Sequence, residues 1–341
     1  MARRRGGRDG RGDEFWNRGW TSEMSTFGRV CGAGRLLSVL GMAHTIEVSG
    51  LHKRYGDVHA VDGVTFDVGE GEFFGILGPN GAGKTTTLEI IEGLREADEG
   101  DVSVLGAAPW PRNPRLLPRI GVQLQASSFF ERLTAREQLR TFGSLYGVPA
   151  RRADEMLETV GLDDKADVRV EKLSGGQAQR LSIACALVHD PELVFLDEPT
   201  AALDPQSRRN LWDLLRGINT GGRTIVLTTH YMDEAEILCD RVAIMDGGRM
   251  LRLGPPAVLV RGLDAPARIS VPSGVLPVED ARRLPAADEA GDDGVSLTIS
   301  TREPSAVVAA MAAKDALDGV QIRGATLEDV FLDVTGREYR A

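Results

Sequence analysis

A glycine-rich loop that ends in Lys-Thr is the part of this chain best suited to chemistry. It is the run Gly78-Pro79-Asn80-Gly81-Ala82-Gly83-Lys84-Thr85, which fits the pattern G-x-x-x-x-G-K-[ST]. The apolar residues 73–77 before it predict a buried strand, and Thr86 after it opens a predicted helix. Such a loop turns successive backbone N–H groups toward one anion, and the helix N-terminus adds a positive dipole end. A glycine turn that binds nothing is the alternative, but this context favours a nucleotide triphosphate, with Lys84 on its terminal phosphates and Thr85 on magnesium.

A pair of acids follows a second apolar run. Residues 193–196 read Leu-Val-Phe-Leu, as expected of a strand buried on both faces of a parallel sheet, and Asp197-Glu198 come next. Alone, two acids after a strand can simply begin a solvated loop. Together with the phosphate loop, they predict that Asp197 holds the magnesium and that Glu198 is the general base for an attacking water.

Between these two clusters lies Leu173-Ser174-Gly175-Gly176-Gln177, which resembles the signature motif of ABC-type ATPases. Other motifs of that family stand around it in the same order, over about residues 45–260. The resemblance implies ATP and Mg²⁺ as cofactors and nucleotide-binding roles for residues 78–86 and 174–177. It further implies that Tyr55 stacks on adenine, that Gln125 is the Q-loop glutamine at the metal and the attacking water, that Asp204 belongs to the D-loop and that His230 is the switch histidine.

Each of these matches has an alternative interpretation. Tyr55 could be an ordinary surface aromatic, and Gln123 competes with Gln125 because both lie on the same face of the predicted strand. His230 alone could be a surface residue. Asp204 precedes Pro205 and could also cap the following helix, a role compatible with the first.

The signature turn bears on assembly, since Ser174, Gly175 and Gly176 make a second potential anion site at a helix start. In the family this turn closes over ATP that is bound to a second nucleotide-binding subunit. The resemblance therefore implies a dimer, most simply a homodimer with two complete sites, whose closure requires ATP.

Composition limits the partners. The formal net charge is −10, with 50 acidic against 40 basic residues, which argues against a broad nucleic-acid surface. The three cysteines, Cys31, Cys185 and Cys239, are far apart and predict neither a disulfide framework nor a metal site, as is typical of the cytosol. No run of 18 apolar residues occurs, so we expect a separate transmembrane permease subunit and a place for this chain at the cytoplasmic face of the membrane.

The predicted fold is an α/β P-loop NTPase of the ABC ATPase type, with a parallel core sheet, an antiparallel flank, a helical lobe and a small C-terminal α/β appendage. Residues 1–41 form a basic leader without periodicity, in which we expect little order; a true start at Met42 is the favoured explanation, and a disordered basic tail is the alternative. The ATPase domain is placed at residues 42–262, with its helical lobe at about 127–175. Residues 263–341 are expected to form a regulatory or dimerisation domain.

Within these domains, particular elements are expected. Strands are predicted at residues 45–48 and 65–68 (flank), 72–77, 193–196 and 224–228 (core), and 267–271 and 295–300 (appendage). Thr134 and Glu137 predict a capping box that opens a helix through Tyr146, and a second helix is predicted at 151–160. Helices are also expected at 305–314 and 326–334, and a mobile loop at 288–294. Phe129 and Phe130 stand where the family's helical lobe meets the membrane subunit; one core and one exposed ring is the alternative.

The last predicted helix, with Thr335-Gly336-Arg337 after it, resembles the tail of the drug-export (daunorubicin-resistance-like) branch of ABC ATPases. It predicts the ATP-hydrolysing subunit of an exporter of a small molecule, drug or lipid-like substrate. The rival is an ABC ATPase that acts on ribosomes, DNA or another cytosolic assembly. The chain has one cassette and no long coiled-coil insertion, features that favour the exporter. A P-loop kinase or GTPase would have no use for the Ser-Gly-Gly-Gln turn.

Overall fold

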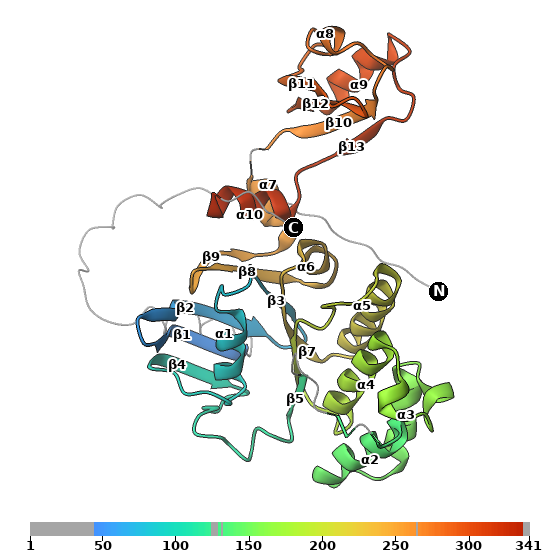
Figure 1. The fold of residues 1–341 in the computed structure, drawn as a ribbon. Coiled ribbons are helices and arrows are strands. Elements are labelled where there is room, and N and C mark those ends of the chain that lie inside the picture. Colours follow the sequence, from blue (N-terminus) through green and yellow to red (C-terminus); the bar gives the residue numbers. More distant parts are fainter. Residues whose placement is uncertain (1–43, 124–128, 131, 264, 337–341) are drawn as a thin grey trace, which may run out of the picture. The chain divides into compact units, whose positions relative to one another are not determined.

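The computed structural model describes residues 44–123, 129–130, 132–263 and 265–336 (Figure 1). Its contacts divide the chain into two compact units, residues 1–40 and 41–341. The first unit lies outside the described residues, and so do Cys31 and Gln125. Everything below concerns the second unit. Within the described ranges, no helix combines the length and apolar character needed to cross a membrane.

A six-stranded sheet forms the centre of the second unit, in the order β5-β6-β7-β3-β8-β9. The strands are β3 (Phe73–Leu77), β5 (Ile120–Gln123), β6 (Leu193–Asp197), β7 (Thr224–Thr229), β8 (Arg241–Asp246) and β9 (Arg249–Gly254). All neighbours pair in parallel except β8 and β9. Every residue of β3, β6 and β7 is buried, which explains the apolar runs at residues 73–77, 193–196 and 225–227. The carboxyl ends of the parallel strands share one edge, where ligands of such sheets bind.

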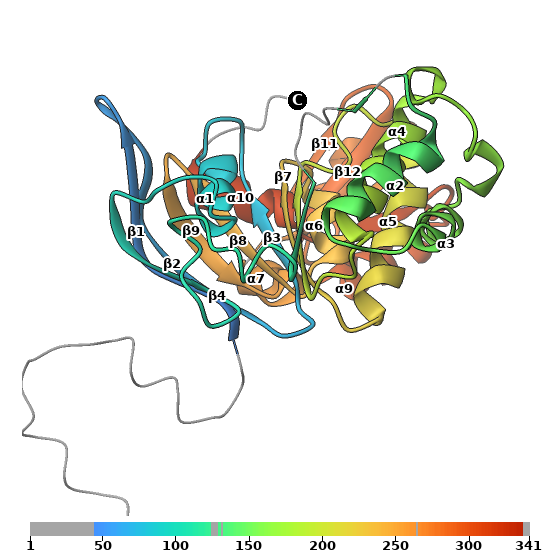
Figure 2. The ribbon, with the colours of Figure 1, turned by 90° about the horizontal axis from the view of Figure 1, so that it is seen from below.

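An antiparallel sheet in the order β2-β1-β4 covers one side of the central sheet (Figure 2). It comprises β1 (His44–Tyr55), β2 (Val58–Gly69) and β4 (Glu99–Val104). Its buried face and the central sheet share one hydrophobic core, in which the rings of Phe66 and Phe74 stack with centroids 5.1 Å apart. The predicted flanking strands are confirmed. The third strand, β4, was not predicted because its first three residues are exposed and only Val104 is buried.

Helices cover the other side of the central sheet. There α4 (Gly175–Leu187) and α5 (Pro205–Thr220) pack into a second core with α6 (Met232–Leu238). The helical lobe adds α2 (Ala135–Leu145) and α3 (Arg151–Thr159), close to their predicted positions. The capping box before α2 is confirmed: Glu137 N–H donates to Thr134 Oγ1 over 3.2 Å, and Thr134 N–H donates to Glu137 Oε2 over 2.9 Å. The helix that follows the phosphate loop is α1 (Lys84–Ile91).

A four-stranded sheet with its own core follows in the chain, in the order β11-β12-β10-β13. Its elements are β10 (Ala267–Pro272), α8 (Val278–Ala281), β11 (Glu289–Asp292), β12 (Ser296–Thr301), α9 (Pro304–Ala312) and β13 (Gln321–Arg323). The predicted strands at 267–271 and 295–300 are confirmed. The loop predicted at 288–294 is wrong, because β11 occupies it and pairs with β12. Ala290 is the one apolar side chain that β11 buries, too weak a pattern to reveal a strand.

The last helix, α10 (Leu327–Thr335), packs away from that small core. Its side chains Leu327, Val330 and Phe331 are buried in the same core as α4 and α5. Glu236 of α6 accepts a hydrogen bond from the Leu327 N–H, and α10 also lies against α7 (Pro256–Gly262). The chain thus returns to the core between the central sheet and its helices after the four-stranded sheet.

Candidate nucleotide site

The phosphate loop has the geometry that an anion requires. It connects β3 to α1, and Gly81 and Gly83 have φ angles of 80° and 100°, which L side chains rarely adopt. A Cβ at Gly78 would lie 2.3 Å from the Met245 carbonyl oxygen, and one at Gly83 would lie 2.2 Å from that of Ala60. Only glycine fits at these two positions, so the backbone N–H groups at the start of α1 stay accessible.

Lys84 is held inside this loop. Its Nζ donates to the carbonyl oxygens of Gly78 and Pro79 over 2.9 and 3.2 Å. It also lies 3.2 Å from Oε1 of Glu198, and only 4% of the lysine side chain is exposed. The ammonium is therefore fixed where the phosphate loop and the end of β6 meet.

The carboxylate of Asp197 accepts hydrogen bonds from two hydroxyl groups. Thr85 Oγ1 lies 3.3 Å from each of its carboxylate oxygens, and Thr228 Oγ1 donates to Oδ1 over 2.5 Å. Burial raises the pKa of Asp197, an effect that the hydrogen bonds from Thr228 and Thr85 oppose. A hydroxyl and a carboxylate side by side are hard oxygen ligands that suit Mg²⁺, which prefers few protein ligands plus phosphate and water. In the described residues, no cluster of three or more His, Cys, Asp or Glu offers a different metal site.

Glu198 occupies the centre of the site. One carboxylate oxygen faces Lys84, and the other lies 3.3 Å from Nδ1 of His230, just beyond the end of β7. Glu198 has a φ of 48°, and its backbone N–H donates to Thr228 Oγ1 over 3.0 Å. Thr228 therefore positions both acids, a role that its place in an apolar strand did not reveal. The predicted residues from three separated segments, namely the phosphate loop, the end of β6 and the residue after β7, meet in this one site.

Gln123 ends β5 beside Leu196 of β6, one residue before Asp197, and is 2% exposed. Its competitor Gln125 lies outside the described residues, so the structure does not choose between the two.

Tyr55, the predicted partner of adenine, ends β1 with 43% of its surface exposed. Lys53 and Arg95 lie over its ring, at 5.8 and 5.3 Å from the centroid.

The signature turn forms a helix start of its own. Ser174 caps α4: Gln177 N–H donates to its Oγ over 3.3 Å, and Ser174 N–H donates to Gln177 Oε1 over 2.9 Å. Gly176 lies against Ser207 of α5, where a Cβ would come within 3.1 Å of the hydroxyl oxygen. Among the described residues, no hydrogen bond or ion pair joins this turn to the phosphate loop.

Asp204 caps the next helix, α5. It accepts hydrogen bonds from the N–H groups of Gln206 and Ser207 over 3.0 and 2.9 Å and from the Ser207 hydroxyl over 2.6 Å. The bond from that hydroxyl is the main reason why the pKa of Asp204 is lowered. The capping role is thus confirmed. Because Ser207 bonds to Asp204 and also lies against Gly176, the segment at Asp204 is next to the turn at residues 174–177.

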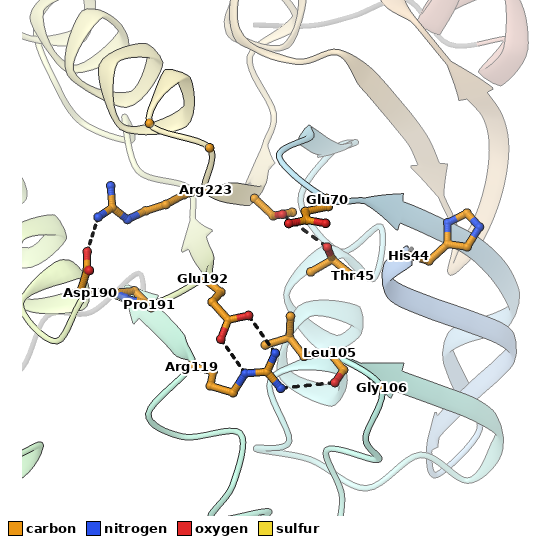
Figure 3. Close-up of a pocket in the computed structure, with 13 residues that line it drawn as sticks. His44, Thr45, Glu70, Leu105, Gly106, Arg119, Asp190, Pro191, Glu192 and Arg223 are labelled. Atoms are coloured by element: carbon orange, nitrogen blue, oxygen red, sulfur yellow. Dashed lines mark hydrogen bonds and ion pairs between the residues drawn. The ribbon is translucent and has the colours of Figure 1, made fainter. Parts of the chain in front are cut away.

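A cleft of about 580 Å³ lies at the opposite edge of the central sheet, near the starts of β6 and β7 (Figure 3). Its arginines are paired with acids: Arg119 makes two hydrogen bonds with Glu192, of 2.7 and 2.8 Å, and Arg223 pairs with Asp190. With its arginines neutralised and no glycine-rich helix start, this cleft is a poor phosphate site.

Comparisons with known proteins agree with this geometry. The family model of the ABC transporter matches residues 61–201. The Nod factor export ATP-binding protein I of Ralstonia nicotianae is 39% identical over 313 residues, which cover 88% of this chain and 97% of that protein. Among solved structures, cbiO1 of Clostridium perfringens, part of the ABC transporter complex cbiONQ, has a TM-score of 0.58 and 28% identity, covering 65% of this chain and 94% of that one. The ATP-binding cassette MJ0796, solved as a dimer bound to ADP and Pi in a post-hydrolysis state, has a TM-score of 0.56 and 29% identity, covering 62% and 98%. The fold, the nucleotide loop and these likenesses together place the chain in the ABC transporter family, as an ATP-binding protein and an ATPase.

Proposed function

We propose that this chain powers an exporter, in which a separate transmembrane permease moves a small molecule, drug or lipid-like substrate. The observation that carries the proposal is the likeness to a protein named for export, which extends over 97% of that protein. The resemblance of α10 and its flanks to the drug-export branch points the same way. The likeness does not define the cargo, because the permease, and not the ATP-binding chain, recognises the transported molecule.

The site suggests how hydrolysis proceeds. Lys84 and the backbone N–H groups of residues 78 and 80–86 bind the phosphates, and Tyr55 stacks on adenine. Glu198 takes a proton from the attacking water, while His230, 3.3 Å away, orients the carboxylate. Thr85 and Asp197 would hold Mg²⁺, with Gln125 as a further ligand, and the ion would neutralise charge on the transferring phosphoryl group.

We further propose that each site needs two copies of the chain. Among the described residues, no hydrogen bond or ion pair joins the signature turn to the phosphate loop of the same copy, and the similar cassette MJ0796 was solved as a dimer. Residues 174–177 of one copy would bind the ATP held by the other, with Asp204 at the seam. A homodimer then carries two equivalent sites.

The helical lobe offers the face for the membrane partner. Phe130 is 58% exposed and, with Phe129, lines a surface depression beside α2. Phe129 is partly buried against the helical core, and an exposed aromatic side chain such as Phe130 in an apolar depression is typical of a protein interface. Docking there would place the chain at the cytoplasmic face of the membrane.

The separate core of the four-stranded sheet supports a domain boundary near residue 262. We assign a regulatory or dimerising role to that sheet.

The test is affinity purification of the tagged full chain from detergent-solubilised membranes of its own cells, followed by mass spectrometry. An integral membrane protein with several spans, recovered in stoichiometric amount, is the expected result. Recovery with ribosomal or DNA-bound proteins instead would favour the rival ABC ATPase and contradict the exporter.

A further inference from the structure

A buried acid of α6 has no role in the hydrolysis mechanism proposed for this chain. Glu234 belongs to the first turn of that helix, shortly after His230, and its exposed fraction is 0%. Its Oε1 accepts a buried hydrogen bond of 3.0 Å from Nε1 of Trp212 on α5. A carboxyl group is costly to bury unless its neighbours satisfy it, so the groups around Glu234 indicate what it holds together.

The carboxyl group of Glu234 lies where three segments of the chain meet. Burial raises its pKa, and the side chains of Thr229, Thr200 and Trp212 lie close enough to oppose that rise. Thr229 is the last residue of β7, and Thr200 lies in the loop between β6 and α5. Both threonines are 1% exposed. One carboxyl group therefore touches the end of β7, this loop and α5.

Thr229 passes this contact on to His230. Its Oγ1 accepts a hydrogen bond of 3.0 Å from the Tyr231 N–H, so the hydroxyl holds the backbone on the far side of the histidine. A hydroxyl that accepts still has its own hydrogen to donate, here toward Glu234. The Tyr231 ring lies beside the His230 ring with centroids 4.1 Å apart, and Arg208 of α5 lies 4.1 Å from the Tyr231 centroid. The histidine is therefore fixed relative to both β7 and α5.

The loop between β6 and α5 depends on such contacts. It begins after Asp197 with Glu198, and Glu198 and Ala202 have φ angles of 48° and 60°. Angles of this kind are unfavourable for residues other than glycine and persist where the surroundings hold the backbone. Within the described part of the chain, Oγ1 of Thr200 and Oε2 of Glu234 are buried, and neither completes a hydrogen bond of good geometry. A small movement of the loop would let these two neighbouring groups bond to each other.

We propose that Glu234 is a positioning residue for ATP hydrolysis, which aligns His230 with the loop between β6 and α5. It acts through the hydroxyl groups of Thr229 and Thr200, because one carboxyl group serves both. The alignment matters since the acid assigned as the base begins this loop, and the loop ends at the seam with the second copy. This inference rests on the proposed roles of His230 and of the loop. Glu234 itself touches neither the nucleotide nor the attacking water.

The test measures kcat, ATP affinity and unfolding free energy of purified full-length variants. Thr200→Val removes the hydroxyl and keeps the size of the side chain, and we expect kcat to fall at least about fivefold. ATP affinity should change less than about twofold, because the phosphate loop is untouched. Thr200→Ser keeps the hydroxyl and should recover most of the rate. The matched control is Glu236→Gln: Glu236 is an exposed acid of the same helix that accepts from the Leu327 N–H, and kcat should stay within about twofold.

A double-mutant cycle separates positioning from packing. Glu234→Leu should slow hydrolysis as much as Thr200→Val, and the double variant should be no slower than either one, because the two groups act as a unit. If Glu234 only joined α5 to α6, Trp212→Phe would reproduce the effects of Glu234→Leu on rate and stability, and Thr200→Val would keep the wild-type rate. Thr200→Val should fold like the wild type, so the test stands even where Glu234→Leu does not fold.

A wild-type rate for Thr200→Val, or losses that add up in the double variant, would overturn the inference. His230→Ala distinguishes this failure from a failure of the proposed hydrolysis mechanism. Slow turnover of His230→Ala beside normal turnover of Thr200→Val would leave the histidine's role intact and remove only that of Glu234. A wild-type rate for His230→Ala would instead contradict the mechanism itself.

Discussion

Lys84 and Glu198 form an ion pair at the centre of the nucleotide site, with Nζ 3.2 Å from Oε1. The lysine that we assign to the phosphates thus shares its charge with the acid that we assign to the attacking water. A triphosphate in the loop would compete with Glu198 for the ammonium. Binding of substrate would then release the carboxylate, and His230 would keep hold of its other oxygen.

Glu198→Gln is expected to bind ATP at least as tightly as the wild type, because the amide no longer competes for Lys84. Loss of the base should slow turnover about 100-fold or more and let an ATP-bound dimer accumulate. Steady-state hydrolysis, nucleotide titration and size-exclusion chromatography with ATP measure the three effects. Glu192→Gln, an exposed acid at the far edge of the sheet, is the control that should retain full turnover. A wild-type rate for Glu198→Gln would remove the base assignment.

Ser174→Arg is expected to retain ATP binding by the single chain and lose hydrolysis. The arginine adds bulk and charge to the turn that we assign to the partner's nucleotide, while the chain's own phosphate loop is untouched. Nucleotide affinity of the monomer and turnover at high protein concentration provide the measurement. If a variant monomer hydrolysed ATP at the wild-type rate, the composite site would be refuted.

Thr228→Val tests the hydroxyl that positions both acids. The change leaves Asp197 without its donor at 2.5 Å and Glu198 N–H without its acceptor at 3.0 Å. We expect kcat to fall by about tenfold or more, with a loss of about 1–3 kcal/mol in unfolding free energy. Thr228→Ser, which keeps the hydroxyl, should recover most of both. Equal behaviour of the two variants would show that the hydroxyl does not position the acids.

Glu92 gives the folded chain a characteristic pH dependence. Its pKa is raised from 4.5 to about 9, so the folded state holds a proton that the unfolded state releases above pH 4.5. The stability of the wild type should therefore fall as pH rises between these values, by about 3 kcal/mol from this group at pH 7. Glu92→Gln removes this loss, so its excess Tm over the wild type should grow from pH 5 to pH 8. A constant difference would mean that Glu92 is ionised in the folded chain.

Local sequence patterns revealed much of this architecture. Short-range chemistry decides features such as the phosphate loop and the Thr134 capping box, where a few neighbouring residues satisfy one another's backbone groups. The core strands were visible because burial on both faces demands continuous apolar residues. The order of the motifs, rather than any single residue, indicated the family.

Other features depend on contacts between distant segments and had no local signal. The short strand β11 gains its hydrogen bonds from β12 and buries only Ala290. Thr228 looks like any threonine of a strand until β6 places Asp197 beside it. Glu92 reads as one more polar residue at a helix end, and only the packing of β5 and α4 around it shows that it is buried, with no hydrogen bond to its carboxyl oxygens among the described residues.

A crystal structure of Glu198→Gln with ATP and magnesium tests the central claim most directly. The account predicts two chains around two nucleotides, with Ser174 of each chain in hydrogen-bond contact with the terminal phosphate held by Lys84 of the other. An occluded nucleotide with Ser174 facing solvent would contradict it.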